Sequence, residues 1–232
     1  MPISDERYKR ARLEGFHRIL AAAGVSVARP ALERAYDASG AYLASVWASH
    51  RDITGEEHVR AVLTAADPAL PQRLSPAILT ALLDAYSRPA LIVPPTVDPG
   101  ALGALSVLRA RGLILAVVSN TMRTPGATLR QLLAHYGLLP HFAHTTFSDQ
   151  VAIRKPAPEI FWLTLKAVGG EAESAVHVGD DPVLDVRGAR AAGMRVIQVG
   201  SRRSHRGAQA EPDGVIPGLA ALPDMITKLA ER

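Results

Sequence analysis

The chain has 232 residues, a formal net charge of +4, 48% hydrophobic residues and no cysteine. This composition excludes an intrinsically disordered chain, and the length suits one large domain or two small ones. The lack of cysteine excludes disulfides, thiol nucleophiles and cysteine-bound zinc, and it favours a cytoplasmic location. No apolar stretch reaches the ~20 residues of a membrane span, and the charged start does not resemble a signal peptide.

The first part of the chain shows helical spacing of apolar residues. This spacing predicts four helices, over 7–24, 29–50, 55–67 and 75–88. A stretch rich in proline follows at 88–100 and predicts a linker. The sequence therefore predicts a helical domain over 1–93 and a second domain over 94–232.

The second domain alternates between helical and strand patterns. Strands are predicted over 113–120, 142–149, 174–181 and 194–200, and helices over 99–112, 124–138, 155–170, 182–193 and 216–232. Such alternation is typical of an α/β fold with a doubly wound parallel sheet. The apolar run at 113–118 predicts a strand buried on both faces. In such sheets, ligands bind beyond the carboxyl ends of the strands.

Polar residues end the first of these strands. The hydroxyl of Ser119 and the backbone around Asn120 precede a helix, which is the usual arrangement of a phosphate-binding site. A simple helix cap is the alternative, with Thr124 as the competing capping residue.

Lys155 precedes two prolines and the start of a predicted helix. A helix amino end disfavours positive charge, so the position of Lys155 needs an anionic ligand or a carboxylate partner. A solvated surface lysine is the alternative.

Three carboxylates, Asp180, Asp181 and Asp185, follow the strand predicted over 174–181. Crowded carboxylates repel one another unless a cation or proton relieves them, and oxygen ligands suit Mg²⁺. We expect Asp180 and Asp185 to be the metal ligands and to raise each other's pKa when no metal is bound. Asp181 precedes Pro182 and is predicted to be an N-cap.

The order of these clusters resembles the haloacid dehalogenase superfamily, in the branch with a helical cap. The stretches that carry the resemblance are "VVSNT", "RKPAPEIF" and "VHVGDDPVLDVRGARAAGM". The resemblance implies a Rossmann-like core beneath a helical cap. It implies that Ser119, with Asn120, binds a phosphoryl group, that Lys155 steadies that group, and that Asp180 and Asp185 hold Mg²⁺ directly or through water.

One motif of that superfamily has no counterpart. The first strand of its members ends in Asp-x-Asp, whose first aspartate is the nucleophile, and this sequence contains no Asp-x-Asp. We therefore expect the central strand to be missing, the chain to be truncated at its amino end, and the 232 residues alone to be inactive.

The resemblance implies a magnesium-dependent phosphatase that hydrolyses a small phosphorylated metabolite through an aspartyl-phosphate. A 2-haloacid dehalogenase is one alternative, although the acidic cluster argues against it. A catalytically inactive relative that binds phosphate or a protein partner is the other. The basic stretch 201–207 is predicted to be a solvated loop, so neither nucleic acid nor a membrane is an expected partner.

Overall fold

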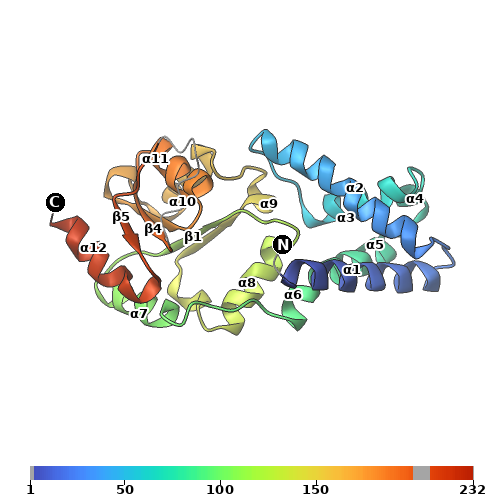
Figure 1. Ribbon diagram of the computed structural model, residues 1–232, viewed down its shortest axis with the longest axis horizontal. Helices are drawn as coiled ribbons and strands as arrows, with labels where there is room; N and C mark the ends of the chain where they lie inside the picture. The colour runs from blue at the N-terminus through green and yellow to red at the C-terminus, as the bar shows by residue number, and fades with distance from the viewer. Residues whose placement is uncertain (1–2, 201–209, 232) are drawn as a thin grey trace. The chain divides into compact units, whose positions relative to one another are not determined.

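The computed structural model describes residues 3–200 and 210–231. The chain divides into two compact units, which we call the helical unit and the sheet unit (Figure 1). The helical unit comprises Met1–Pro95 and Thr121–Leu132, and the sheet unit comprises Thr96–Asn120 and Leu133–Arg232. This division falls beside the predicted boundary at 93–94, but it assigns 121–132 to the helical unit. The basic stretch 201–207 lies outside the described residues.

The helical unit is built on an apolar core that its helices share. It contains α1 (Ile3–Ala22), α2 (Arg29–Ala48), α3 (Gly55–Ala66), α4 (Leu70–Arg73), α5 (Pro76–Ser87), α6 (Pro89–Ile92) and most of α8 (Gly126–His135). Phe16, Leu20, Leu63 and Tyr86 are among its fully buried residues. The four predicted helices are confirmed, and the short helices α4 and α6 were not predicted.

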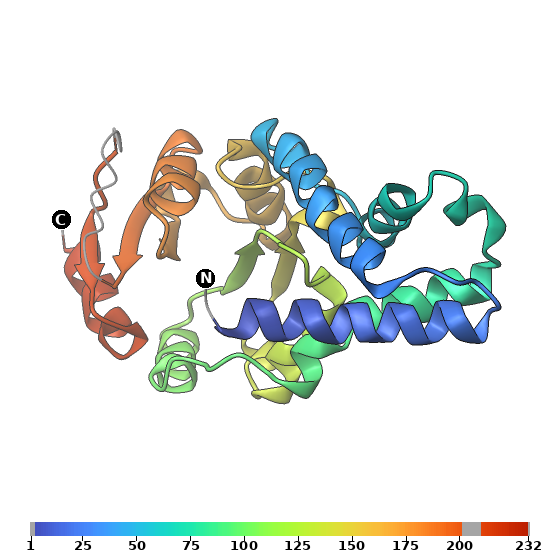
Figure 2. The same ribbon diagram turned by 45° about the vertical axis from the view of Figure 1, so that its right-hand side comes forward.

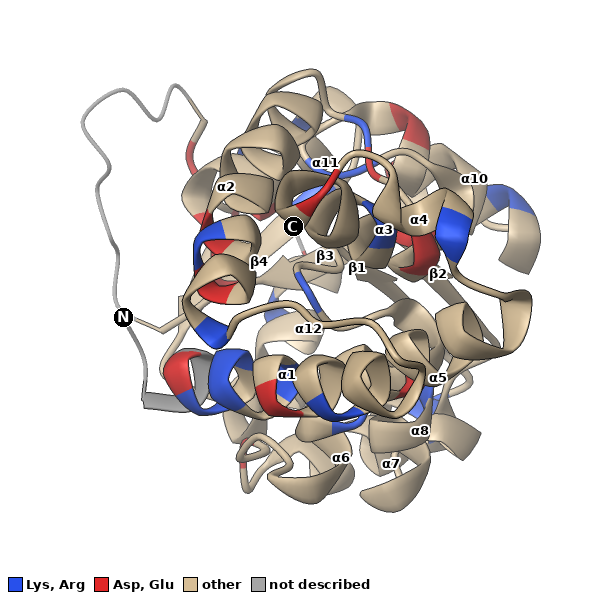
Figure 3. Cartoon of the chain, turned by 90° about the vertical axis from the view of Figure 1, so that its right-hand side faces the viewer, with Lys and Arg blue, Asp and Glu red and all other residues tan. Residues whose placement is uncertain are grey.

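Local sequence explains where these helices begin. Thr54 caps α3 through a capping box, in which its side chain accepts from the Glu57 N–H and the Glu57 carboxylate accepts from the Thr54 N–H. The Ser75 hydroxyl caps α5 ahead of a proline at its first position. In Figure 3, α1 shows basic and acidic residues interspersed along its length.

The sheet unit contains short parallel strands and the helices that connect them. Its strands are β1 (Ala116–Ser119), β2 (His144–Phe147), β3 (Val176–Gly179), β4 (Arg195–Val199) and β5 (Gly214–Ile216). Its helices are α7 (Ala101–Ala110), α9 (Ser148–Val151), α10 (Pro158–Val168), α11 (Gly188–Ala191) and α12 (Leu222–Ala230), with the one-and-a-half-turn π-helix η3 (Pro182–Arg187) and the 3-10 turns η1 (Leu139–His141), η2 (Ala172–Ser174) and η4 (Leu219–Ala221). The strand β5 was not predicted.

The strands form two sheets rather than one. β1 pairs with β2, and β3 pairs with β4, which pairs with β5, all in parallel. Figure 2 shows β1 and β2 in green and yellow, apart from the orange and red strands. Within the described residues no ladder joins β1 to β3. Helix α10 contacts β1 and β2, and its Phe161 lies in the same apolar cluster as Val118 of β1 and Val196 of β4.

The exposure of β1 corrects one prediction. The apolar run before Ser119 predicts a strand buried on both faces, yet all four residues of β1 are only half-buried. Three of the four residues of β3 are half-buried as well. The physical reason is that each strand has a ladder partner on one edge only among the described residues, so its other edge is open.

No helix in the described parts of the chain combines the length and the apolar character that a bilayer crossing requires.

Candidate active site

Parallel pairing aligns the carboxyl ends of the strands that carry the candidate residues. Ser119 is the last residue of β1 and pairs in register with Phe147 of β2. Gly179 is the last residue of β3 and pairs with Gln198 of β4. Residues that follow these two positions therefore begin at the strand ends where α/β sheets bind their ligands.

Asn120 connects the end of β1 to Lys155. Its side-chain Nδ2 donates to the Lys155 carbonyl at 2.9 Å, and its Oδ1 accepts from the Lys155 N–H at 2.8 Å. Both polar atoms of the Asn120 side-chain amide are thus hydrogen-bonded to the backbone of a single residue that is distant in the sequence. Asn120 fixes the backbone of Lys155 beside Ser119, so these three predicted residues do come together.

Lys155 forms an ion pair with Asp185. The distance between Lys155 Nζ and Asp185 Oδ1 is 2.6 Å, and the side chains are 12% and 4% exposed. Of the explanations predicted for Lys155, the carboxylate partner is confirmed and the solvated surface lysine is excluded. The pair holds the charged ammonium group against η3, which follows β3.

His177 of β3 is the second partner of Asp185. Its Nε2 lies 2.8 Å from the same Oδ1 atom, and its ring meets the ring of Phe161 edge-on with centroids 5.0 Å apart. Burial lowers the pKa of His177, and this effect outweighs the opposing influence of Asp185. The imidazole is therefore neutral at pH 7, and its Nε2–H donates to the carboxylate.

Asp185 stays ionised in this setting. Burial acts to raise its pKa, but the hydrogen bond from His177 and the charge of Lys155 outweigh burial and hold the pKa well below its usual range. Its Oδ2 also accepts from the Asp181 N–H at 3.0 Å. The predicted mutual rise of the Asp180 and Asp185 pKa values is therefore wrong for Asp185, because donors rather than another carboxylate surround it.

The backbone around Asp185 is shaped to admit it. A Cβ atom at Gly179 would overlap the Asp185 carboxyl group, so only glycine fits at the end of β3. The Asp181 carboxylate accepts from the N–H groups of Val183 and Leu184, both at 2.8 Å, and starts η3. The predicted N-cap role of Asp181 is confirmed, and it explains why this carboxylate is not free to bind a ligand.

Asp180 differs from its two neighbours. Its side chain is exposed, and within the described residues it makes neither a hydrogen bond nor an ion pair. No group of three or more His, Cys, Asp or Glu side chains in residues 3–200 and 210–231 is arranged to hold a metal. Mg²⁺ often binds through one or two carboxylates plus water and substrate oxygens. Asp180 fits such a ligand, whereas Asp185 does not fit as a direct one while three N–H donors occupy it.

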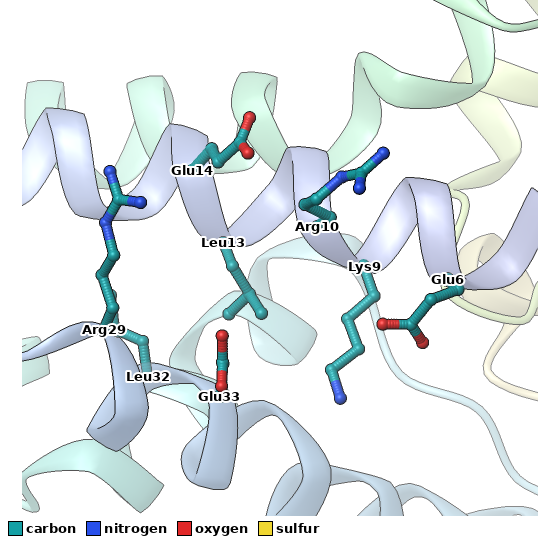
Figure 4. A pocket seen from close by; sticks show the side chains of 8 residues that line it. All are labelled: Glu6, Lys9, Arg10, Leu13, Glu14, Arg29, Leu32 and Glu33. Carbon is teal, nitrogen blue, oxygen red and sulfur yellow. The ribbon is translucent and has the colours of Figure 1, made fainter.

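Grooves of the helical unit offer other cavities. One of about 300 Å³ lies between α1 and α2, where side chains of both charges alternate (Figure 4). Another of about 480 Å³ lies between α2 and α3 and includes Tyr42. Neither groove contains a cluster of candidate catalytic side chains comparable to Lys155, Asp185 and His177.

A profile of haloacid dehalogenase-like hydrolases matches residues 13–193, which is more than half of the chain. The chain belongs to this family of hydrolases. The match covers most of the helical unit, β1 with Ser119, and η3 with Asp185, and the α/β fold with parallel strands agrees with it. The resemblance inferred from the three motifs is thereby confirmed.

Several curated relatives of this chain are phosphatases. It is 39% identical over 115 residues to a phosphoserine phosphatase from Thermus thermophilus, covering 50% of this chain and 45% of the relative. It is 38% identical over 113 residues to a phosphoglycolate phosphatase from Rhodospirillum rubrum, covering 49% and 45%. The matched part thus spans less than half the length of these relatives.

Solved structures share the fold across nearly the whole chain. A 2-haloacid dehalogenase from Pseudomonas syringae pv. Tomato superposes with a TM-score of 0.65 at 23% identity, covering 96% of this chain and 92% of that one. A phosphatase of the same family from Thermococcus onnurineus gives a TM-score of 0.57 at 24% identity, covering 96% and 91%. At these identities the likeness concerns the fold alone.

His177 is the site residue that sequence reasoning missed. A histidine between two valines in a strand predicts a packed core residue, and His177 is indeed buried. The sequence holds no local signal for its hydrogen bond to Asp185, because the strand and η3 bring the two together only in the folded chain.

Proposed function

We propose that this chain is the main part of a hydrolase that cleaves small phosphomonoesters. The observation that carries the proposal is the cation Lys155, fixed by Asn120 and Asp185 beside Ser119 at the carboxyl end of β1. A largely buried ammonium group, on a residue whose backbone is tied to the strand end that carries a hydroxyl, suits the binding of a phosphoryl group. The phosphatase names of the curated relatives support the same substrate class.

Each residue then has a role that its contacts suggest. The Ser119 hydroxyl and the backbone at Asn120 would hold the phosphoryl oxygens, and Lys155 would stabilise the charge that develops on them. The side chains of Asp185 and Asn120 act as positioning groups, because they hold Lys155 in place. His177 keeps Asp185 ionised and oriented.

The nucleophile is proposed to come from an additional strand between β1 and β3. A carboxylate there would attack phosphorus and displace the alcohol, giving an aspartyl-phosphate, and water would then cleave the acyl-phosphate bond to release phosphate. Among the described residues, β1 and β3 each have one edge without a ladder partner, and this supports an additional strand, because edges of half-buried apolar strands are normally paired or covered. The 232 residues contain no Asp-x-Asp sequence that could supply this carboxylate.

Mg²⁺ would be held through Asp180 and, when bound, would neutralise charge on the phosphoryl oxygens. Asp185 is proposed to act indirectly. It would orient Lys155, as its contacts indicate, or it would bind a water molecule that the metal holds.

One observation favours a second candidate, a 2-haloacid dehalogenase. Among the described residues, all three donors to Asp185 are N–H groups, so this carboxylate is committed to Lys155, His177 and the backbone rather than to a metal. Displacement of halide from carbon needs a carboxylate nucleophile and an anion-binding lysine but no metal ligand set.

The test compares two proteins, the 232-residue chain and a version with an apolar strand of ~6 residues ending in Asp-x-Asp fused ahead of Met1. We expect the fused protein, with Mg²⁺, to hydrolyse p-nitrophenyl phosphate and the shorter chain to be inactive. Ser119→Ala and Lys155→Met in the fused protein should each lower kcat/KM by about 10²-fold or more. Lys166→Met, which removes an exposed lysine of α10, is the matched control.

The same fused protein separates the alternatives. Release of chloride from 2-chloropropionate without Mg²⁺, and no phosphate release, would establish the dehalogenase instead. A folded fused protein that is inactive on both substrates would overturn the hydrolase proposal and leave a phosphate-binding or protein-binding role.

A further inference from the structure

Gln198 is an amide side chain buried near the end of an apolar strand. It lies in β4 between Ile197 and Val199 and is 3% exposed. Removing an amide from water is unfavourable unless its polar atoms form hydrogen bonds. Its Nε2 donates to the Asp180 carbonyl at 3.3 Å, which is the only hydrogen bond of this side chain within residues 3–200 and 210–231. The partner of this buried glutamine is thus the backbone of the candidate metal ligand.

The pairing of β3 with β4 places Gln198 on the same face of the sheet as Asp185. Gln198 is the in-register partner of Gly179, and the side-chain positions of paired residues lie on one face. A Cβ atom at Gly179 would overlap the Asp185 carboxyl group, so Asp185 lies on that face too. The two side chains therefore reach the turn after β3 from the same side of the sheet.

The peptide group between Asp180 and Asp181 is held at both of its polar atoms. Gln198 Nε2 donates to its carbonyl oxygen at 3.3 Å, and its N–H donates to Asp185 Oδ2 at 3.0 Å. A planar peptide group that is hydrogen-bonded at both atoms is held in one orientation. On the other side of Asp180, the ladder between β3 and β4 fixes Gly179. The backbone of Asp180 is thus fixed on both sides, although its side chain is exposed.

We propose that Gln198 is a positioning residue for the binding of Mg²⁺, because it fixes the backbone from which the Asp180 carboxylate extends. The role rests on the proposed function, in which Asp180 holds the ion. With the backbone fixed, cation binding has to order only the side-chain dihedral angles of Asp180, so less conformational entropy is lost. Mg²⁺ also requires near-ideal octahedral geometry, which a ligand on a rigid turn satisfies more readily than one on a loose turn.

Glutamine suits this role through its N–H donor and its lack of charge. An apolar side chain would leave the Asp180 carbonyl without the donor. An ionised glutamate has no N–H to donate. A lysine or arginine would donate, but it would place a positive charge close to the carboxylate that has to attract the cation. The amide therefore supplies the hydrogen bond without opposing the binding of the ion.

Calorimetric titration of the 232-residue chain with Mg²⁺ tests the role of Gln198. Gln198→Met keeps the length of the side chain but removes the donor, and it should raise the Kd for Mg²⁺ about fivefold, as expected for the loss of one neutral hydrogen bond. The Kd for inorganic phosphate should not change, because among the described residues Gln198 forms no hydrogen bond with Lys155. Without metal, hydrogen exchange of the Asp181 N–H, followed by NMR, should become faster.

Ile197→Val is the matched control. It shortens a fully buried side chain of the same strand, and neighbouring strand residues point to opposite faces of the sheet. The control should lower the melting temperature but keep the Kd for Mg²⁺ and the exchange rate of the Asp181 N–H. If Gln198→Met does not fold, Gln198→Asn carries the same test, because its amide is one methylene shorter and does not reach the Asp180 carbonyl.

The two binding constants separate failure of the positioning role from failure of the proposed function. An unchanged Kd for Mg²⁺ in the folded Gln198 variant would overturn the positioning role and leave the proposed function intact. An equal loss of affinity for Mg²⁺ and for phosphate would also overturn it, because a general distortion of the site explains that result. If wild type binds phosphate but not Mg²⁺, both Asp180 as a metal ligand and the role of Gln198 are contradicted, whereas the phosphoryl site at Lys155 is retained.

Discussion

Lys155 Nζ and Asp185 Oδ1 lie 2.6 Å apart, and this pair joins the two sheets of the sheet unit at their strand ends. Lys155 follows the segment after β2, and Asp185 lies in η3 after β3. Because Asn120 holds the Lys155 backbone from the end of β1, contacts from both sheets converge on one lysine. The pair is thus a structural connection as well as the candidate anion site.

Asp185→Asn should destabilise the chain by about 3–5 kcal/mol at pH 7, because it leaves Lys155 buried without its partner. The pKa of Asp185 is lower in the folded chain than its unfolded value of about 3.9. The contribution of Asp185 to the free energy of unfolding is therefore fully present above about pH 5 and is lost as the pH falls toward the pKa of Asp185 in the folded chain. Urea unfolding at several pH values measures this. Asp180→Asn, at an exposed carboxylate, should change stability little, and an equal effect of the two variants would contradict the pairing.

His177 should remain neutral at pH 6.5, where an unperturbed histidine is half protonated, because burial lowers its pKa. Stability linked to His177 is present above the unfolded pKa and is lost as the pH falls below it, since the unfolded chain then binds the proton more readily. An NMR titration of the histidine ring signals, assigned with His177→Gln, checks this. A midpoint for His177 at or above 6.5 would be inconsistent with its contacts.

Asn120→Ala should cost about 2 kcal/mol, roughly 1 kcal/mol for each of the two hydrogen bonds to the Lys155 backbone. It should also weaken phosphate binding, because Lys155 is no longer held. Combined with Lys155→Met, its effect on phosphate affinity should be less than additive, since both changes act on one contact. Gln131→Ala, at an exposed position of α8, is the control for stability. Full additivity of the two changes on affinity would show that Asn120 does not act through Lys155.

Millimolar Mg²⁺ should raise the melting temperature of the wild-type chain, because a ligand that binds only the folded state stabilises it. Asp180→Asn should abolish this shift, since Asp180 is the carboxylate free to bind the ion. Ca²⁺ and Na⁺ at matched ionic strength separate specific binding from screening. A shift that survives Asp180→Asn would place the ion elsewhere.

The sequence predicts much of the fold because apolar periodicity is a local property. The four strands at 116–119, 144–147, 176–179 and 195–199 fall inside predicted ranges. The strand β5 has only three residues and lacks a clear alternating pattern, so periodicity does not identify it. The exposure of β1 depends on which strands pair with it, which periodicity does not specify.

The candidate site is predictable in part for the same reason. Ser119, Lys155 and Asp181 carry local signals, namely a strand end, prolines after a lysine and a proline after an aspartate. The pairing of Asp185 with Lys155 and His177, instead of with Asp180, arises from the path of η3 beneath Gly179. Spacing along the chain places Asp180 and Asp185 near each other but does not specify which donors each one meets.

Binding of inorganic phosphate to the 232-residue chain, measured by calorimetry for wild type and Lys155→Met, shows whether Lys155 forms an anion site. The measurement requires neither a nucleophile nor turnover. Wild type should bind phosphate, and Lys155→Met should weaken this binding by about tenfold or more, while Lys166→Met at an exposed site of α10 should not. Phosphate affinity that is unchanged in Lys155→Met would show that Lys155 does not bind the anion.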